Sequence, residues 1–236
     1  LLLLLVPPVA YGLTLARSVV FSDPTEYTFV AHVLGIAHPP GYAFYTLLGK
    51  LFQTLVPVGA VAARMHLLSA VVATVAALFV YGTVRAASLL LFPDRRAPFD
   101  VAAAAAVFAA LTFGLAADVW QHAIHANPHI VTAAFLAANL CLLTRWAAGG
   151  GGDRRWLLAF SLSAGLGVTH HPLTVIAFPA FLGAYPLNVA RNVMTYMALA
   201  ISWDMLLRSG QISFGIAGLF GLGSYASILA VLRGGM

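Results

Sequence analysis

The strongest constraint in this sequence is a series of long apolar runs that recurs along its whole length. A helix that crosses a membrane needs about 20 consecutive apolar residues, so runs of this kind indicate membrane spans. None of them alternates in polarity as a membrane β-strand does. We therefore predict an all-α, polytopic transmembrane protein with about seven or eight membrane spans. The runs are residues 1–20, 65–92, 101–117, 130–147, 157–169, 173–187, 192–207 and 212–232.

The composition narrows the class of protein further. Of the 236 residues, 61% are hydrophobic and 8% are charged, whereas soluble domains carry about a quarter charged residues. This excludes a water-soluble enzyme, a nucleic-acid-binding module and a disordered tail. The net charge of +5 is interpreted as a membrane-topology signal carried by short loops. We predict an integral, multi-pass membrane protein with membrane lipid, and no nucleic acid, among its partners.

Paired arginines indicate which loops face the cytoplasm. Arg95-Arg96 and Arg154-Arg155 lie in two loops that are separated by two of the apolar runs. The positive-inside rule places both pairs in the cytoplasm, and the number of runs between them agrees. The external face is then expected to hold the loops 21–41, 118–129 and 169–172.

Two segments do not fit a simple span. If residues 42–57 crossed the bilayer, the next run would return to the wrong side, and this short stretch contains Lys50 and Gln53. We predict that it is a helix lying in the membrane interface, next to further interfacial helices of the first external loop. Runs 157–169 and 173–187 are shorter than the usual minimum of about 17 residues. They form either a tight hairpin turning at 169–172 or one broken span.

Most chemically capable side chains gather in the loops assigned to the external face. Ionisable residues at membrane depth are functional candidates, because burying them costs several kcal/mol. The cytoplasmic loops, in contrast, carry mainly arginine, aspartate and glycine. We therefore predict an active site on the external face. Its candidates include Asp23, Glu26, His38, Gln121, His122, Asn127, His170 and His171.

Some of these residues also have purely structural interpretations. Asp23-Pro24-Thr25-Glu26 fits a capping box, with Asp23 as the helix N-cap and Glu26 at the third helical position. His122, His125 and His129 have the spacing of one helical face, which suggests a metal site. However, Pro128 disfavours a continuous helix through them, and we predict no metal.

A family resemblance rests on the first external loop. Phe21-Ser22-Asp23-Pro24-Thr25-Glu26 is followed by Val33 to Tyr42, which includes Ala37-His38-Pro39-Pro40-Gly41-Tyr42, and by Tyr45 to Gly49. Arg64 and Leu67-Leu68-Ser69-Ala70 match the start of the next span. These segments resemble the GT-C class of membrane glycosyltransferases that is related to the protein O-mannosyltransferases. The resemblance extends over about residues 8–185.

The resemblance implies an enzyme that transfers a mannose-type sugar from a polyprenyl-phosphate donor to a protein or glycan acceptor on the external face. No cofactor is implied, because the lipid-linked sugar is a substrate. Asp23 would be the catalytic base and Glu26 a neighbouring acceptor-site carboxylate. The bacterial members imply a bacterial cytoplasmic membrane. Substrate-binding residues would be His38, Tyr42, Arg64, Gln121, His122, Asn127, His170 and His171.

The sequence also departs from this family's pattern. Ser22 replaces a glycine, Pro24 and Thr25 replace Ser and Gly, and Asn127 replaces a glutamate of the second external loop. The loss of that glutamate leaves open whether activity is retained or whether a histidine takes over its role.

Residues 188–231 resemble part of a branched-chain amino acid ABC transporter permease, through Ser209-Gly210-Gln211-Ile212-Ser213 and Gly221-Leu222-Gly223-Ser224-Tyr225. We therefore divide the chain into an incomplete, N-terminally truncated glycosyltransferase-like core, residues 1–187, and a permease-like segment, residues 188–236. Two alternative functions follow. One is a permease subunit that binds an ABC ATPase, and the other is a non-catalytic truncated membrane fusion.

Overall fold

A computed structural model describes residues 2–39, 41–91, 99–171 and 174 of the chain. Within these ranges the protein is helical and contains no strand, which confirms the predicted all-α class. The helices are α1 (Leu2–Thr14), α2 (Asp23–Val33), α3 (Ala43–Leu55), α4 (Val61–Leu91), α5 (Phe99–Gly114), α6 (Ala117–Ala123), α7 (His129–Ala148) and α8 (Arg154–His170).

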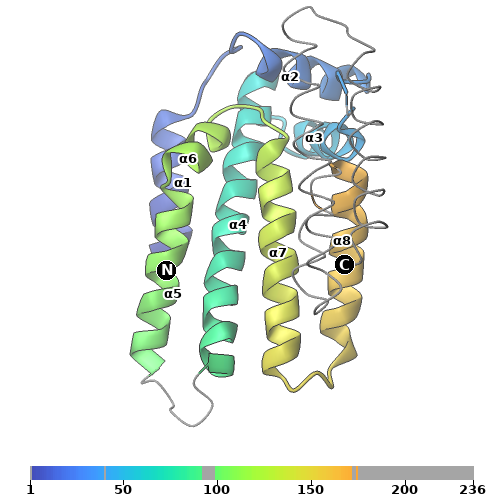
Figure 1. Ribbon diagram of the computed structural model, residues 1–236. Helices are drawn as coiled ribbons and strands as arrows, with labels where there is room; N and C mark the ends of the chain where they lie inside the picture. Colours follow the sequence, from blue (N-terminus) through green and yellow to red (C-terminus); the bar gives the residue numbers. More distant parts are fainter. Residues whose placement is uncertain (1, 40, 92–98, 172–173, 175–236) are drawn as a thin grey trace, which may run out of the picture. The chain divides into compact units, whose positions relative to one another are not determined.

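Helix α4 is the centre of an up-and-down bundle. It packs against α1, α5 and α7, and α7 packs in turn against α8 (Figure 1). Buried alanines on α4, such as Ala73 and Ala77, allow this close approach, as small residues do between membrane helices. Gly82 of α4 also lies close to α7, since an added Cβ would lie 2.6 Å from Cys141 Sγ.

Two of the described helices, α4 and α7, are long and apolar enough to cross a membrane. A third span results if Val101–Gly114 and Ala117–Ala123, which bend by 63° at a short break, are counted as one. Helix α4 has 31 residues and a length of about 46 Å at 1.5 Å per residue, enough to cross a bilayer core of about 30 Å. The runs 173–187, 192–207 and 212–232 lie outside the described residues, so the predicted number of spans stays a prediction.

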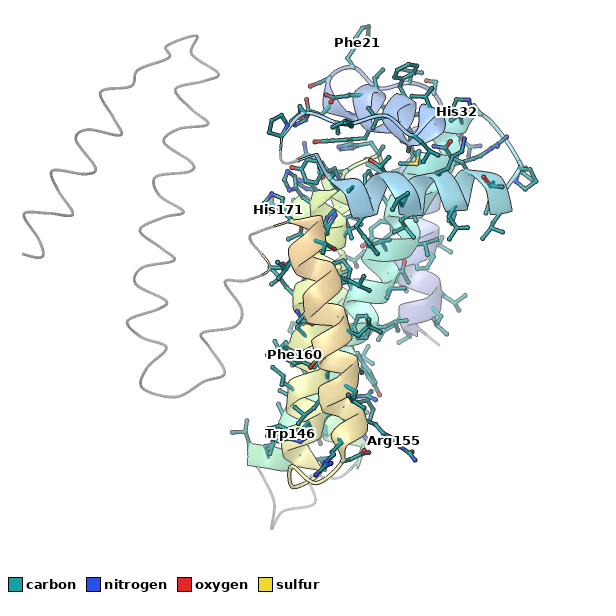
Figure 2. The ribbon with its side chains drawn as sticks, turned by 90° about the vertical axis from the view of Figure 1, so that its right-hand side faces the viewer. Phe21, His32, Trp146, Arg155, Phe160 and His171 are labelled. Atoms are coloured by element: carbon teal, nitrogen blue, oxygen red, sulfur yellow. The ribbon has the colours of Figure 1, made fainter. Side chains whose placement is uncertain are left out.

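The two ends of the bundle differ in chemistry. Helices α2, α3 and α6, the start of α7 and the end of α8 lie at one end, and the turn between α7 and α8 lies at the other (Figure 1). Figure 2 shows the same separation, with His171 near α3 and with Trp146 and Arg155 at the opposite end. Asp153 forms the N-cap of α8 there by accepting a hydrogen bond from the Arg155 amide at 3.0 Å. The three polar loops of the sequence therefore meet at the end opposite the Arg154-Arg155 pair.

Helices α2 and α3 run across the end of the bundle, and a close contact fixes their position (Figure 2). A Cβ added to Gly49 of α3 would lie 2.7 Å from Met65 Cε of α4 and 3.0 Å from Ala31 Cβ of α2. A side chain at position 49 would therefore require Met65 to move and Ala31 to give way, so the glycine favours the close packing of these three helices. The Lys50 ammonium strengthens the junction by donating a hydrogen bond to the His32 carbonyl oxygen at 2.6 Å, near the C-terminal end of α2, where a positive charge is favourable.

Candidate functional site

Asp23 is the first residue of α2, and its side chain is exposed. The interpretation of Asp23 as the N-cap of a capping box is wrong, because the N-cap is Ser22 and the Glu26 carboxylate binds elsewhere. The Ser22 hydroxyl donates a hydrogen bond of 3.2 Å to Asp23 Oδ1. Asp23 thus presents an exposed carboxylate at a helix N-terminus, where the helix dipole favours a negative charge.

The backbone of Ser22 is strained. Its φ of 77° and ψ of −154° fall in a region that is essentially restricted to glycine and that costs other residues about 1–3 kcal/mol. The Thr25 amide donates a hydrogen bond of 3.0 Å to the Ser22 carbonyl oxygen, and the Thr25 hydroxyl donates to the Val20 carbonyl oxygen. These bonds hold the strained residue directly before Asp23, which indicates that the surrounding structure determines the position of the Asp23 carboxylate.

Glu26 binds the loop that follows α2. Its Oε1 atom accepts a hydrogen bond of 2.7 Å from the His38 amide, and its Oε2 atom lies 2.8 Å from His38 Nδ1. The His38 side chain and backbone thereby hold the pKa of Glu26 below its ordinary value. Both side chains remain more than a third exposed. Glu26 is therefore an ionised carboxylate at neutral pH, with both oxygen atoms engaged by one residue.

Tyr42 connects the helices that meet at this end of the bundle. Its side chain is 4% exposed and its backbone is left-handed, with φ 45° and ψ 44°. The His171 ring stacks on the Tyr42 ring at a centroid distance of 5.7 Å and an interplanar angle of 26°. Tyr42 is therefore the common ring of a cluster built from four helices or their adjoining loops. The rings around it are those of Tyr27, His38, His129, His170 and His171.

His170 and His171 differ in burial although they are adjacent. His170 is 2% exposed, and its Nε2 atom donates a hydrogen bond of 2.9 Å to the Pro128 carbonyl oxygen. The Nδ1 atom of His170 is buried, and among the described residues it has no hydrogen-bond partner. His171 is only partly buried, and burial lowers its pKa, so that its imidazole is neutral at pH 7. His171 is thus the member of this pair that a ligand can reach.

The second polar loop reaches the cluster through His129. Asn127 Oδ1 accepts a hydrogen bond of 2.9 Å from the His129 amide, so Asn127 stabilises the first turn of α7. The His129 ring contacts the Tyr42 ring at 6.0 Å. Asp23 is close enough to His129 for its charge to act on the imidazole. Asn127 therefore has a structural role in addition to the predicted substrate-binding role.

The three histidines of this loop do not share one helix. His122 lies on α6, His125 follows that helix, and His129 begins α7 after Pro128, as predicted from the proline. The His122 ring lies 6.1 Å from the His129 ring, and burial lowers the pKa of His125. In the described part of the chain, no group of three His, Cys, Asp or Glu residues is placed to hold a metal ion.

Arg64 lies at the end of α3 that is remote from Tyr42. The Arg64 guanidinium donates hydrogen bonds to the Gln53 carbonyl oxygen at 3.1 Å and to the Gly59 carbonyl oxygen at 2.8 Å. Gln53 lies eleven positions after Tyr42, which is about 16 Å along a helix. Gln121 is exposed on α6. Arg64 therefore holds the far end of α3 in place, and its predicted binding of a donor phosphate stays a prediction.

Two residues of the cluster were absent from the predicted site. Tyr27 directly follows Glu26, and its hydroxyl lies 3.3 Å from His38 Nε2. His129 lies in the polar loop 118–129 that is expected on the external face, but the sequence assigns it an individual role only as a candidate metal ligand. Their position in the sequence could have indicated both as site residues, because Tyr27 adjoins the candidate carboxylate Glu26 and His129 lies two positions after Asn127. Their spatial role depends on contacts with Tyr42 that no local pattern shows.

The arrangement can perform acid–base chemistry at a polar surface. It combines one exposed carboxylate, one carboxylate–imidazole pair and several further imidazoles, all near the end of an apolar bundle. A carboxylate can accept the proton of a hydroxyl nucleophile, and imidazoles can bind hydroxyl or phosphate oxygens.

Comparison with known proteins identifies relatives of this chain. A family model described as the protein O-mannosyl-transferase TMEM260 N-terminal domain matches residues 23–195. Protein O-mannosyl-transferase TMEM260 of Mus musculus is 36% identical over 136 residues, which cover 58% of this chain and 18% of the mouse protein. The protein of the same name from Dictyostelium discoideum is 37% identical over 78 residues, which cover 32% of this chain and 10% of that protein. No solved structure matches.

These matches also bear on the predicted bacterial membrane and on the predicted permease-like segment. The two relatives are eukaryotic, so they give no support to a bacterial cytoplasmic membrane. The resemblance of residues 188–231 to an ABC transporter permease is likewise unsupported, and that segment lies outside the described residues. The boundary predicted after residue 187 stays a prediction.

Proposed function

Because the chain belongs to the family of the protein O-mannosyl-transferase TMEM260 N-terminal domain, we propose that it carries the acceptor-activating site of a membrane mannosyltransferase. The chain spans less than a fifth of the length of the relatives it matches, so the complete reaction belongs to the longer protein. The single observation that carries this proposal is the exposed Asp23 carboxylate beside the Tyr42 cluster. A glycosyltransferase that attaches sugar to a hydroxyl needs such a base.

The proposed donor is a mannose linked to a polyprenyl phosphate. The acceptor hydroxyl oxygen attacks the anomeric carbon, the bond from that carbon to the phosphate oxygen breaks, and polyprenyl phosphate leaves. Asp23 accepts the hydroxyl proton, which balances the charge of the attacking oxygen. A lipid-linked donor suits this site, because the site lies at the end of helices that are long enough to cross a bilayer.

We further propose that the Tyr42 cluster faces the external side and that α2 and α3 lie in the membrane interface. The Arg154-Arg155 pair at the opposite end supports this orientation through the positive-inside rule. Helix α3 runs across the bundle (Figure 2) and exposes Leu47, Leu51 and Leu55 at intervals of four residues. Such an apolar stripe on a helix perpendicular to the spans suits the boundary between acyl chains and headgroups. In this proposal, the part of the longer protein that corresponds to this chain crosses the membrane about seven or eight times.

A donor assay tests this function. The full-length protein is reconstituted in liposomes with a serine- and threonine-containing acceptor peptide, and either polyprenyl-phosphate mannose or GDP-mannose is supplied. We expect mannose transfer from the lipid-linked donor without any nucleotide sugar. Transfer that requires GDP-mannose contradicts the proposed donor, and the absence of transfer from both donors favours the non-catalytic alternative.

A further inference from the structure

The two carboxylates in the first turn of α2 have different surroundings. The Asp23 carboxylate is exposed and receives a hydrogen bond from the neighbouring Ser22 hydroxyl. Both oxygens of Glu26, in contrast, are used by His38, one by its amide and one by its imidazole. A carboxylate whose oxygens are both engaged is poorly suited to take a proton from a substrate, because those bonds stabilise its ionised form.

The bond from His38 to Glu26 determines which nitrogen of the imidazole carries the proton. An ionised carboxylate can only accept hydrogen bonds, so His38 Nδ1 must donate to Glu26. In neutral His38, the Nε2 atom is then an acceptor. It lies 3.3 Å from the Tyr27 hydroxyl, which can donate to it. Glu26, His38 and Tyr27 therefore form a hydrogen-bonded chain with a defined direction.

Two members of this hydrogen-bonded group, Tyr27 and His38, contact the Tyr42 ring. The Tyr27 ring meets the Tyr42 ring edge to face at a centroid distance of 5.5 Å, and the His38 ring meets it at 6.1 Å. The turn before Tyr42 is closed by a hydrogen bond of 2.9 Å from the Gly41 amide to the His38 carbonyl oxygen. Tyr42 itself has a left-handed backbone, which persists in a residue other than glycine only where neighbouring contacts hold it. The contacts of His38 supply that restraint.

We propose that Glu26 is a positioning residue, which acts through His38 and Tyr27 to hold Tyr42 and thereby the His129 and His171 rings that contact it. This inference rests on the proposed function and divides the roles of the two carboxylates. Asp23 touches the acceptor hydroxyl, whereas Glu26 fixes the framework on which the site is built.

Kinetics of three variants of the full-length protein test this division. Glu26→Gln keeps a carbonyl oxygen that can accept one of the two His38 N–H groups, so kcat is expected to fall less than about tenfold. Glu26→Ala removes both acceptors, and kcat is expected to fall about 10- to 100-fold, with KM for the lipid donor unchanged within about threefold. Asp23→Asn is expected to lower kcat by at least about 100-fold.

A second measurement needs no substrate. Hydrogen–deuterium exchange of the peptide that contains His38 and Tyr42 is expected to increase in both Glu26 variants and to stay unchanged in Asp23→Asn. The positioning role is overturned if Glu26→Gln loses as much kcat as Asp23→Asn while exchange stays at the wild-type level. If Asp23→Asn retains full transfer, the proposed function fails, but unchanged exchange in Glu26→Ala still overturns the positioning role and increased exchange supports it.

Discussion

Replacing Asp23 by Asn is expected to lower the rate of mannose transfer by about 10²- to 10⁴-fold, the usual contribution of a positioned general base. Asparagine has nearly the same shape and still accepts the hydrogen bond that the Ser22 hydroxyl gives to Asp23 Oδ1, but its amide cannot take up the proton of the acceptor hydroxyl. The fold is expected to be unaffected, because the Asp23 side chain is exposed and does not cap α2. The measurement is the single-turnover rate of transfer to an acceptor peptide.

Asp118 provides a matched control for this variant. It is also an exposed aspartate in the first turn of a helix at the same end of the bundle. Its backbone carbonyl oxygen, not its carboxylate, accepts the hydrogen bond from His122 Nδ1. Asp118→Asn is therefore expected to leave the rate within about threefold of wild type. Equal transfer rates for Asp23→Asn and wild type would contradict the role of Asp23 as the general base.

Replacing Ser22 by Gly is expected to raise thermal stability. Glycine adopts the Ser22 conformation, φ 77° and ψ −154°, without the strain of about 1–3 kcal/mol that a side chain causes. Part of this gain is offset, since a glycine loses about 0.5–1 kcal/mol more backbone entropy on folding. A net stabilisation of about 1 kcal/mol corresponds to an increase in Tm of about 2–4 °C, which differential scanning fluorimetry in detergent can detect.

Two further variants separate backbone strain from loss of the hydroxyl. Ser22→Ala removes the hydrogen bond to Asp23 but keeps the Cβ atom, so it is expected to give no stabilisation. Ser161→Gly changes an exposed residue within α8 and is expected to destabilise the protein by about 0.5–1 kcal/mol, as glycine does inside a helix. An increase in Tm for Ser22→Ala equal to that for Ser22→Gly is incompatible with backbone strain as the cause.

The sequence was sufficient to predict the features that depend on hydrophobicity and on proline. Long apolar runs predicted the helices of the bundle, and the break caused by Pro128 separated His122 from His129 as expected. Helix α8 begins before the predicted run at 157, because Asp153 caps it and the polar Arg154 and Arg155 belong to its first turn. The apolar runs therefore predicted that a helix exists more accurately than they predicted where it begins.

The site required tertiary information. The pattern Asp23-Pro24-Thr25-Glu26 fits a capping box, but the Glu26 carboxylate binds His38, twelve positions later, instead of returning to the start of its own helix. Likewise, nothing local in the sequence shows that Tyr42 contacts rings from α2, α7 and the residue after α8. Such contacts depend on how the helices pack, in particular at Gly49, where a Cβ atom would crowd Met65 of α4 and Ala31 of α2.

Photoaffinity labelling tests most directly whether the Tyr42 cluster is the sugar-transfer site. A polyprenyl-phosphate mannose with a photoreactive group on the sugar is cross-linked to the full-length protein in liposomes, and labelled peptides are identified by mass spectrometry. We predict labelling of peptides that contain Asp23, Tyr42, His129 or His171, which decreases when unmodified donor is added in excess. Competed labelling confined to the turn at Gly149–Arg155, or to regions outside this chain, would contradict the account.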